Sequence, residues 1–166
     1  MRVALDFRPD ERGWFEEIWH REKWSESRLS WFTPVQQNAS FNNLAGSTRG
    51  FHAEPWNKLI TVVAGSAFCA WVDLRPDEEF GATHYELVSP GEAFFIPAGV
   101  ANAYKAVEDG TSYVYLVDGH WTEEAGYLSL SLRDNELNFP WPISLDRAVI
   151  SEKDRHNPTL ESLRAR

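Results

Sequence analysis

The sequence predicts an all-β protein built as a sandwich or barrel, and three observations support this fold class. Short apolar or alternating runs recur at roughly ten-residue spacing through the first three-quarters of the chain, with turn residues between them. Aromatic residues make up 14% of the chain, which suits a well-filled β-rich interior. The pairs Gly65-Ser66 and Asp109-Gly110 are typical of hairpin turns, because glycine accepts positive φ freely.

These runs predict strands at residues 14–19, 35–41, 59–64, 67–74, 84–88, 93–96, 101–107 and 112–117. Two other stretches predict short helices. One lies at residues 22–29, and the second lies in the charged tail, residues 151–166, where Asn157-Pro158 suits a first helical turn. Because the chain has 166 residues and neither an internal repeat nor a flexible linker, we expect a single domain over residues 1–166 with a terminal appendage.

The charge balance and the cysteine count exclude several classes of function. Lys and Arg total 16 against 25 Asp and Glu, so the formal net charge of -9 argues against nucleic acid and anionic membrane surfaces as partners. No apolar stretch approaches the roughly 18 residues of a spanning helix, and Asp6 comes too early for a secretory leader. Cys69, the one cysteine, lies in an apolar run and predicts a buried, unreactive thiol. We therefore expect a cytoplasmic protein.

Residues 91–102 have the spacing of the second cupin motif, G-x5-P-x-G-x2-H. Pro97 and Gly99 form its tight corner, but the final position, normally a metal-binding histidine that faces the lumen, is Asn102. The first cupin motif requires His-x-His followed by Glu, and the chain after His52 lacks the second histidine. Because one imidazole and one amide are too few ligands for a first-row metal, the sequence resembles a cupin-type jelly-roll barrel without a metal site. The alternative is that this corner is only a hairpin turn.

Three polar residues, His52, Tyr115 and Lys58, are candidates for catalytic chemistry, and Arg49 lies three positions before the histidine. His52 can accept and release a proton near neutral pH, and Arg49 suits phosphate or carboxylate groups. Residues three apart in an ideal strand face opposite sides, so a turn or bulge must intervene if both serve one pocket. Tyr115 can donate a proton, and Lys58 opens an otherwise apolar strand. Each also has a structural interpretation: a half-buried histidine bonded to a carbonyl, a core tyrosine and a lysine that protects an edge strand.

Taken together, short blocks of this sequence resemble the dTDP-4-dehydrorhamnose 3,5-epimerase family. The blocks occur in the family's order across nearly the whole chain, and several blocks in one order are more specific than any single one. They are Asp10-Glu11-Arg12-Gly13-Trp14-Phe15-Glu16-Glu17, Val35-Gln36-Gln37-Asn38-Ala39-Ser40, Arg49-Gly50-Phe51-His52, Lys58-Leu59-Ile60, Val72-Asp73-Leu74-Arg75, Ile96-Pro97-Ala98-Gly99, Val114-Tyr115 and Ile150-Ser151-Glu152-Lys153-Asp154.

The resemblance implies an epimerase without metal or cofactor, on a jelly-roll barrel, that acts on a nucleotide-activated 4-keto-6-deoxyhexose. The C4 ketone acidifies the hydrogens at C3 and C5, so the reaction requires no redox cofactor. By analogy with the family, His52 removes such a proton and Asp154 orients the imidazole. Lys58 would stabilise the developing enolate at O4, and Tyr115 would return a proton from the opposite face.

The resemblance also implies residues that bind a nucleotide-diphosphate sugar. Arg49 is the best diphosphate ligand, because its planar guanidinium binds two oxygens at once. Arg12 and Glu17 would reach a neighbouring subunit's site if the chain forms the homodimer that the family implies. The implied binding positions are Arg12, Glu17, Gln36, Gln37, Asn38, Arg49, Asn102, Trp121 and Lys153.

Three departures from the family pattern border the expected pocket. Asn102 replaces the lumen histidine, and the His120-Trp121 pair replaces two tyrosines, although Trp121 still offers a large face for base stacking. The loop from His52 to Lys58 is shorter than usual, which could displace the lysine. The alternatives are a C3-only epimerase, an epimerase of another nucleotide sugar, or a non-catalytic cupin that binds a sugar nucleotide. A metal-dependent cupin dioxygenase ranks last, because its ligands are missing.

Overall fold

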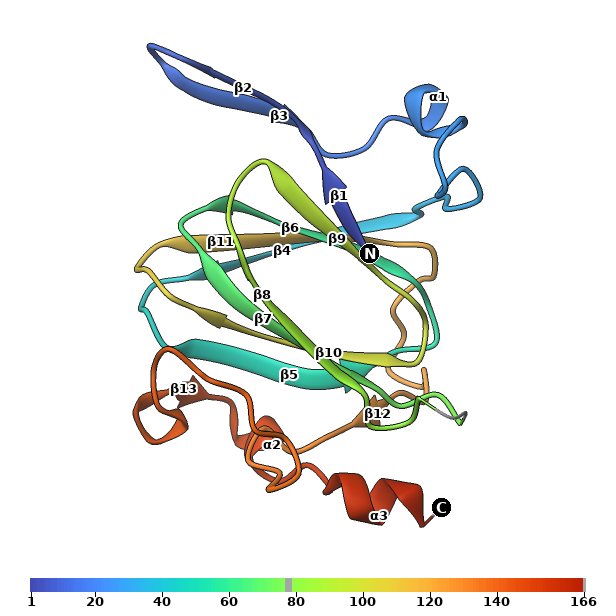
Figure 1. The fold of residues 1–166 in the computed structure, drawn as a ribbon, viewed down its shortest axis with the longest axis vertical. Coiled ribbons are helices and arrows are strands. Elements are labelled where there is room, and N and C mark those ends of the chain that lie inside the picture. Colours follow the sequence, from blue (N-terminus) through green and yellow to red (C-terminus); the bar gives the residue numbers. More distant parts are fainter. Residues whose placement is uncertain (77–78, 166) are drawn as a thin grey trace.

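The computed structural model, which describes residues 1–76 and 79–165, consists mainly of short β-strands (Figure 1). Three short α-helices and one 3₁₀ helix, η1, complete the described part of the chain. In chain order the elements are β1 (Arg2–Ala4), β2 (Asp6–Asp10), β3 (Gly13–Glu17), α1 (Arg21–Trp24), β4 (Gln36–Asn42), β5 (Ser47–Ala53), β6 (Lys58–Ala64), β7 (Ala67–Asp73), β8 (Thr83–Val88), β9 (Glu92–Ile96), β10 (Val100–Ala106), β11 (Thr111–Val117), β12 (Leu128–Ser129), η1 (Leu145–Arg147), β13 (Val149–Ile150), α2 (Glu152–Arg155) and α3 (Leu160–Arg164).

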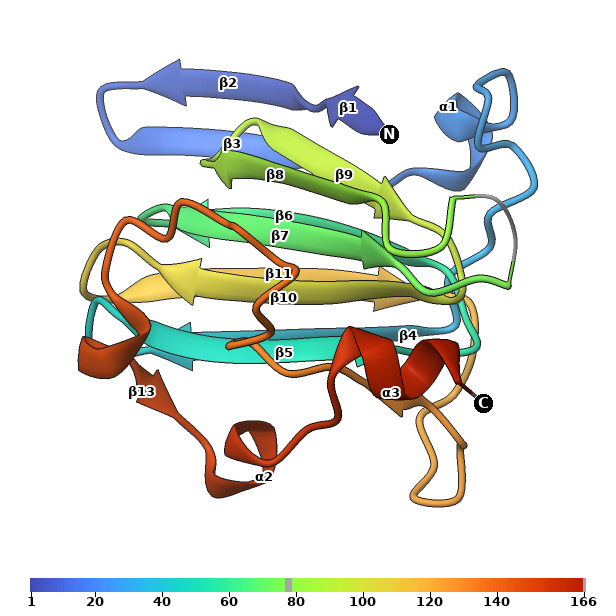
Figure 2. The ribbon, with the colours of Figure 1, turned by 60° about the horizontal axis from the view of Figure 1, so that its bottom comes forward.

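Two sheets face each other and form the barrel. One has the strand order β1-β9-β6-β11-β4, and the other has the order β12-β5-β10-β7-β8, with β13 added in parallel beside β5. In Figure 2 the strands β7, β10 and β5 lie in front of β6, β11 and β4, so that the central strands of one sheet cover those of the other. The all-β prediction is therefore confirmed.

Each of the eight predicted strands corresponds to an observed strand whose ends differ by at most two residues. The sequence pattern missed β5, because Ser47–Ala53 mixes polar residues, glycine and apolar residues without regular alternation. The short edge strands β1, β2, β12 and β13 were not predicted either.

Both helix predictions need correction. The helix expected at residues 22–29 ends at Trp24, because the hydroxyls of Ser25 and Ser27 bond to backbone carbonyls and compete with the helix. The tail helix expected at Asn157-Pro158 begins later, at Leu160, where the Thr159 side chain caps the first turn. The tail also forms α2, which the sequence pattern did not predict as a separate helix.

Three hydrophobic clusters stabilise the fold. One lies between the two sheets, and the other two cover their outer faces. One cluster fills the barrel between the sheets and contains Cys69, which is fully buried, so that burial raises the pKa of its thiol. A second packs the tail against the outer face of β5, β10 and β7, around Phe51 and Leu160. A third packs residues near Leu29 and Phe32 against the other sheet. The tail is thus anchored by burial of apolar surface beside β5.

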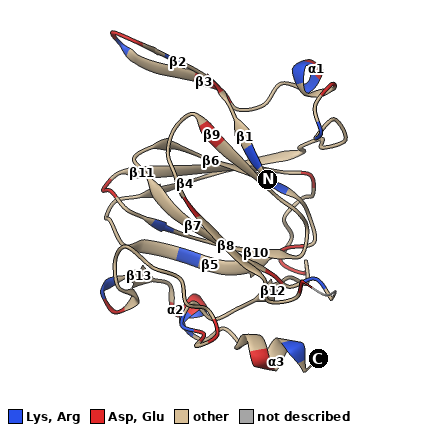
Figure 3. Ribbon diagram, in the orientation of Figure 1, with Lys and Arg blue, Asp and Glu red and all other residues tan. Residues whose placement is uncertain are grey.

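The β2–β3 hairpin extends away from the barrel (Figures 1 and 2). It exposes large apolar side chains, Phe7, Trp14 and Phe15, the last with 62% of its surface accessible. Figure 3 shows charged residues mainly on the hairpin, the loops and the short helices, while most of the barrel strands are uncharged. In the described ranges, no helix is long and apolar enough to cross a membrane.

Candidate active site

A β-bulge in β5 brings Arg49 and His52 to the same cavity. His52 pairs with Asn102 of β10 and Arg49 pairs with Tyr104, so three steps along β5 match two steps along β10. Gly50 lies in the bulge at φ +121°, and a Cβ at this position would lie 2.6 Å from backbone atoms of β10. Only glycine tolerates this approach without a shift of the strands. The bulge that the spacing of the two residues requires is therefore present.

Asp154 lies beside His52 although 102 positions separate the two residues in the chain. Its Oδ1 is 2.8 Å from His52 Nε2, and its Oδ2 accepts a hydrogen bond from the Gly50 N–H at 3.4 Å. The Ser151 side chain caps α2 by accepting from the Asp154 N–H. Because β13 pairs with β5 immediately before this helix, docking of the tail positions the carboxylate.

The charge on Asp154 determines which tautomer His52 adopts. Burial raises the pKa of this carboxyl, but the hydrogen bond and charge of His52, with the Gly50 and Ser151 contacts, outweigh burial and lower the pKa below its ordinary value. The carboxylate is therefore ionised near neutral pH and accepts the Nε2–H of His52. The lone pair is then on Nδ1, which hydrogen-bonds to no group in the described ranges. The imidazole is 27% exposed and can take a proton from a bound ligand.

Lys58 and Tyr115 lie on the other sheet, on the neighbouring strands β6 and β11, where Lys58 pairs with Val117. The Lys58 Nζ is 5.6 Å from the centre of the Tyr115 ring and 2.5 Å from Glu54 Oε2. Burial lowers the pKa of Lys58, and the nearby Glu54 carboxylate opposes this effect. Burial, together with the charge of Glu54, raises the pKa of Tyr115, so its phenol stays protonated near neutral pH.

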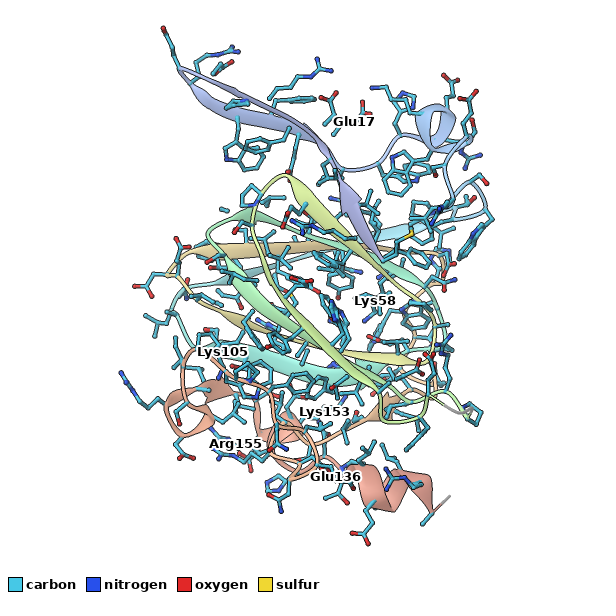
Figure 4. The ribbon with its side chains drawn as sticks, viewed as in Figure 1. Glu17, Lys58, Lys105, Glu136, Lys153 and Arg155 are labelled. Carbon is cyan, nitrogen blue, oxygen red and sulfur yellow. The ribbon has the colours of Figure 1, made fainter. Side chains whose placement is uncertain are left out.

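A cavity of about 530 Å³ lies between the His52–Asp154 pair and the Lys58 and Tyr115 side chains. It is large enough for a sugar. Both sheets and the tail contribute to its lining, which consists of Ser40, Ser47, Thr48, Arg49, His52, Glu54, Lys58, Asn102, Tyr104, Tyr113, Tyr115, Val149, Ile150, Ser151, Lys153 and Asp154. Figure 4 shows Lys58 within the barrel and Lys153 on the tail side of β5. The cavity thus brings the predicted residues His52, Lys58, Tyr115 and Asp154 together with Arg49, Asn102 and Lys153.

A smaller cavity of about 240 Å³ adjoins the first, since Glu54 and Tyr115 line both. Trp121 forms one of its walls and is 57% exposed. The Trp121 backbone N–H donates to Gln36 Oε1 at 3.1 Å, and Gln36 Nε2 donates to Asn38 Oδ1 at 2.9 Å. Three further predicted binding residues are therefore gathered at this second cavity.

The remaining predicted binding residues lie apart from both cavities. Gln37 is exposed on the opposite face of β4 from its two neighbours. Arg12 is at the turn of the hairpin, where its guanidinium is 2.5 Å from Asp10, and Glu17 ends β3. Figure 4 places Glu17 beside the hairpin, away from the barrel. Within one copy of this chain, Arg12, Glu17 and Gln37 do not join the cavity that His52 lines.

Comparison with known proteins agrees with this geometry. Residues 1–162 match the family model described as dTDP-4-dehydrorhamnose 3,5-epimerase. The chain belongs to this family. The resemblance found in the sequence is thereby confirmed, and the protein is an epimerase, an enzyme of the isomerase class.

Individual relatives cover nearly all of the chain. A protein named RmlC homolog from Streptococcus pyogenes serotype M6 is 35% identical over 99% of this chain and 86% of its own length. The dTDP-4-dehydrorhamnose 3,5-epimerase of Methanothermobacter thermautotrophicus is 32% identical over 89% of this chain and 82% of its own. The structure of RmlC from Streptococcus suis in complex with dTDP-D-xylose aligns with a TM-score of 0.88 at 34% identity, covering 98% of this chain and 86% of that one. The predicted cupin-type jelly-roll fold is confirmed by this likeness.

The sequence did not single out Glu54, which lines the larger cavity, or Tyr127, which lies beside His52 and Lys153. Glu54 lies two positions after His52, and the two-residue period of an extended strand would have placed it on the same side. The Tyr127 ring centre is 5.7 Å from that of His52, and the Tyr127 hydroxyl and Lys153 Nζ are hydrogen-bonded. Because Tyr127 lies in a loop without periodic pattern, no sequence signal would have found it.

Of the departures noted in the sequence, Asn102 and the loop before Lys58 border the larger cavity, whereas Trp121 lines the smaller one. Asn102 is buried and donates from Nδ2 to the Tyr113 hydroxyl at 3.3 Å. The short loop after His52 still leaves Lys58 in the cavity. Across the two described ranges, no three or more His, Cys, Asp or Glu side chains form a group that could hold a metal ion.

Proposed function

We propose that this epimerase inverts C3, C5 or both of a dTDP-linked 4-keto-6-deoxyhexose in deoxysugar biosynthesis. The observation that carries the proposal is that a free nitrogen of His52 and the hydroxyl of Tyr115 belong to opposite sheets around one cavity. Inversion of a carbon requires a base on one face and an acid on the other. The dTDP-linked ligand bound to the Streptococcus suis relative supports the choice of nucleotide.

The first step is removal of a proton from the carbon beside the ketone. His52 Nδ1 accepts this proton, and the electron pair of the broken C–H bond moves onto O4 as an enolate. The imidazolium that forms is stabilised by the Asp154 carboxylate, 2.8 Å from Nε2. Asp154 is therefore an orienting partner that stays ionised throughout.

The second step is return of a proton to the opposite face of the same carbon. Lys58 stabilises the negative charge on O4, and preorganised donors of this kind contribute about 3 kcal/mol in comparable sites. Tyr115 donates its phenolic proton to the carbon, because its raised pKa keeps the proton available. The tyrosinate then recovers a proton from solvent, while His52 releases its proton to solvent.

The nucleotide end of the substrate would extend from the sugar cavity towards Trp121. Arg49 and Lys153 line the sugar cavity and supply positive charge for a diphosphate, although the whole chain has a net charge of -9. Trp121 forms a wall of the adjoining cavity, where a base can stack on its indole. Gln36 and Asn38 supply amide groups that can hydrogen-bond to the nucleotide.

We infer that the active enzyme is a homodimer. The hairpin is separate from the barrel of its own chain and exposes Phe7, Trp14 and Phe15, an apolar surface that suits burial against another copy. In such a dimer, Arg12 and Glu17 would reach the partner's cavity. Sedimentation equilibrium should show a dimer, and a monomer with full activity would contradict this inference.

Solvent exchange tests the proposed reaction. The protein should incorporate deuterium from D2O at C3, C5 or both of dTDP-4-keto-6-deoxyglucose, which proton NMR detects as loss of the corresponding signals. Exchange at C3 alone would identify a C3-only epimerase. Exchange with a UDP- or GDP-linked sugar, but not with the dTDP form, would identify another nucleotide sugar as substrate. Binding without exchange in all nucleotide forms would contradict the enzyme and favour a sugar-nucleotide-binding cupin.

A further inference from the structure

Glu54 follows β5 directly, and its carboxylate enters the barrel to meet Lys58, four residues later. The Oε2 atom is 2.5 Å from Lys58 Nζ, and the two side chains are only 13% and 8% exposed. Apart from Lys58, no N–H or O–H in the described ranges donates a hydrogen bond to this buried oxygen. The pair is therefore a buried ion pair in which the lysine is the main compensation for the carboxylate.

Burial makes each charge dependent on the other. Transfer of an isolated ammonium or carboxylate from water into a protein interior costs several kcal/mol, so an unpaired group tends to become neutral. Burial alone favours neutral Lys58, and the Glu54 carboxylate opposes that tendency. Without Glu54, Lys58 would more readily become a neutral amine, which stabilises a developing enolate much less than an ammonium does.

The geometry also leaves Lys58 free to act on a ligand. An ammonium group has three N–H donors, and the contact with Glu54 uses one of them. The Nζ atom still lines the cavity beside Tyr115. Lys58 can therefore hold Glu54 and donate to a substrate oxygen at the same time.

The other charged groups around the cavity are already engaged or carry the same sign as Lys58. On β5, Arg49 and His52 line the cavity, and the tail contributes Lys153 and Asp154. The Asp154 carboxylate bonds to His52. Tyr115 of the adjacent strand is neutral near pH 7, since its pKa is raised. Glu54 is consequently the carboxylate in contact with Lys58.

We propose that Glu54 is a positioning residue of the epimerase, which holds Lys58 in the cavity as an ammonium ion and so supports the enolate on O4. This role rests on the proposed function. The sequence resemblance assigns no role to Glu54. The site then contains two pairs in which a carboxylate supports a catalytic group: Asp154 supports the base His52, and Glu54 supports Lys58.

The ion pair is tested directly by titration of Lys58 in Glu54→Gln, which keeps the side-chain shape and removes the charge. The chain has four lysines, so the ¹³Cε signal of Lys58 can be assigned with a Lys58→Arg variant. Loss of an opposite charge at this distance should lower the pKa of Lys58 by about 1 to 3 units. Glu54→Asp should lower it less. Glu86→Gln should leave it unchanged, because this half-buried carboxylate of β8 lines neither of the two cavities.

The positioning role is tested by the pH dependence of deuterium exchange. Activity that needs the Lys58 ammonium falls as pH rises through the pKa of Lys58, so in Glu54→Gln the loss should begin about 1 to 3 pH units lower. Glu54→Asp should restore part of the alkaline range. Titration of Lys58 itself assigns the shift, because Glu54 also raises the pKa of Tyr115.

Two results would overturn this role. One is a Lys58 pKa that is equal in wild type and Glu54→Gln, with both proteins folded as judged by thermal unfolding. The other is a lowered Lys58 pKa with an unchanged pH profile, which would make the ion pair structural only. Wild-type protein is assayed first. If it exchanges no substrate proton, the proposed function fails, and the role of Glu54 in that reaction fails with it. The titration of Lys58 still shows whether Glu54 and Lys58 form an ion pair.

Discussion

The two sides of the sugar cavity differ in how the chain assembles them. His52 and Asp154 are 102 positions apart and meet because a bulge in β5 and docking of the tail coincide. Lys58 and Glu54 are four positions apart, and Tyr115 lies on the strand next to Lys58. The position of the base therefore depends on long-range packing. The positions of Lys58, which stabilises the enolate, and Tyr115, which returns a proton, depend on a local loop and on the barrel core.

The difference teaches that the two sides should fail in different ways. A change that loosens the tail should impair proton removal first, because Asp154 then no longer orients His52. A change in the loop after β5 should leave the base intact and impair stabilisation of the enolate. The predictions below separate these two kinds of failure, from the largest expected effect to the smallest.

The largest effect is expected for His52→Ala. Loss of the base should lower deuterium exchange by about 10²- to 10⁴-fold, and to background if no other base replaces it. Binding of dTDP, measured by calorimetry, should persist, because the imidazole acts on the sugar. The matched control His84→Ala lies on the exposed edge strand β8 and should exchange normally. An active His52→Ala enzyme would show that another group is the base.

On the opposite side, Lys58→Gln should lower the rate of exchange by about 10²- to 10³-fold, the usual effect of losing one oxyanion-stabilising donor. The lysine is buried, so thermal unfolding must first show that the variant folds. Initial rates of deuterium incorporation measure the effect. A rate within a few-fold of wild type would show that Lys58 does not stabilise the enolate.

The bulge of β5 can be tested through stability. In Gly50→Ala, a positive φ costs about 1 to 2 kcal/mol, and a Cβ placed 2.6 Å from β10 adds about 1 to 3 kcal/mol. Gly110→Ala is the matched control, because Gly110 also has a positive φ but nothing lies within 4 Å of its Cβ position. Urea unfolding should therefore show a larger loss for Gly50→Ala. Equal losses would mean that β10 yields easily at the bulge.

The smallest effect is a pH-dependent contribution of Asp154 to stability. Its pKa is lower in the folded protein, so it stabilises the fold above its unfolded-state pKa and loses that effect as pH falls through the folded value. Asp154→Asn should therefore be less stable than wild type at pH 7 by about 1 to 3 kcal/mol. The difference should shrink towards pH 3, and a constant difference across this range would contradict the ionised carboxylate.

Much of the fold could be predicted from the sequence, because seven barrel strands and one strand of the hairpin have apolar or alternating runs between turn residues. Ser47–Ala53 escaped prediction although it carries His52, since the bulge at Gly50 interrupts the two-residue period on which strand prediction relies. The helix near residue 22 was predicted too long, because local serine hydroxyl bonds compete with helical ones.

The candidate site was predictable in part for a related reason. His52, Lys58, Tyr115 and Asp154 occur in short blocks that the sequence resemblance could match, and the structure gathers them around one cavity. The two-residue strand period could have placed Glu54 on the side of His52, but not its contact with Lys58, which depends on how the connecting loop folds. Contacts across loops leave no periodic trace in a sequence.

The central claim is that base and acid act from opposite sides of the cavity. It is tested most directly by comparing His52→Ala and Tyr115→Phe with dTDP-4-keto-6-deoxyglucose in D2O, with Tyr85→Phe as the exposed control. Proton NMR measures exchange and inversion separately in each sample. We predict that Tyr115→Phe still exchanges the substrate proton but does not invert the carbon, whereas His52→Ala does neither. Inversion at the wild-type rate by Tyr115→Phe, or exchange near the wild-type rate by His52→Ala, would contradict this division of roles.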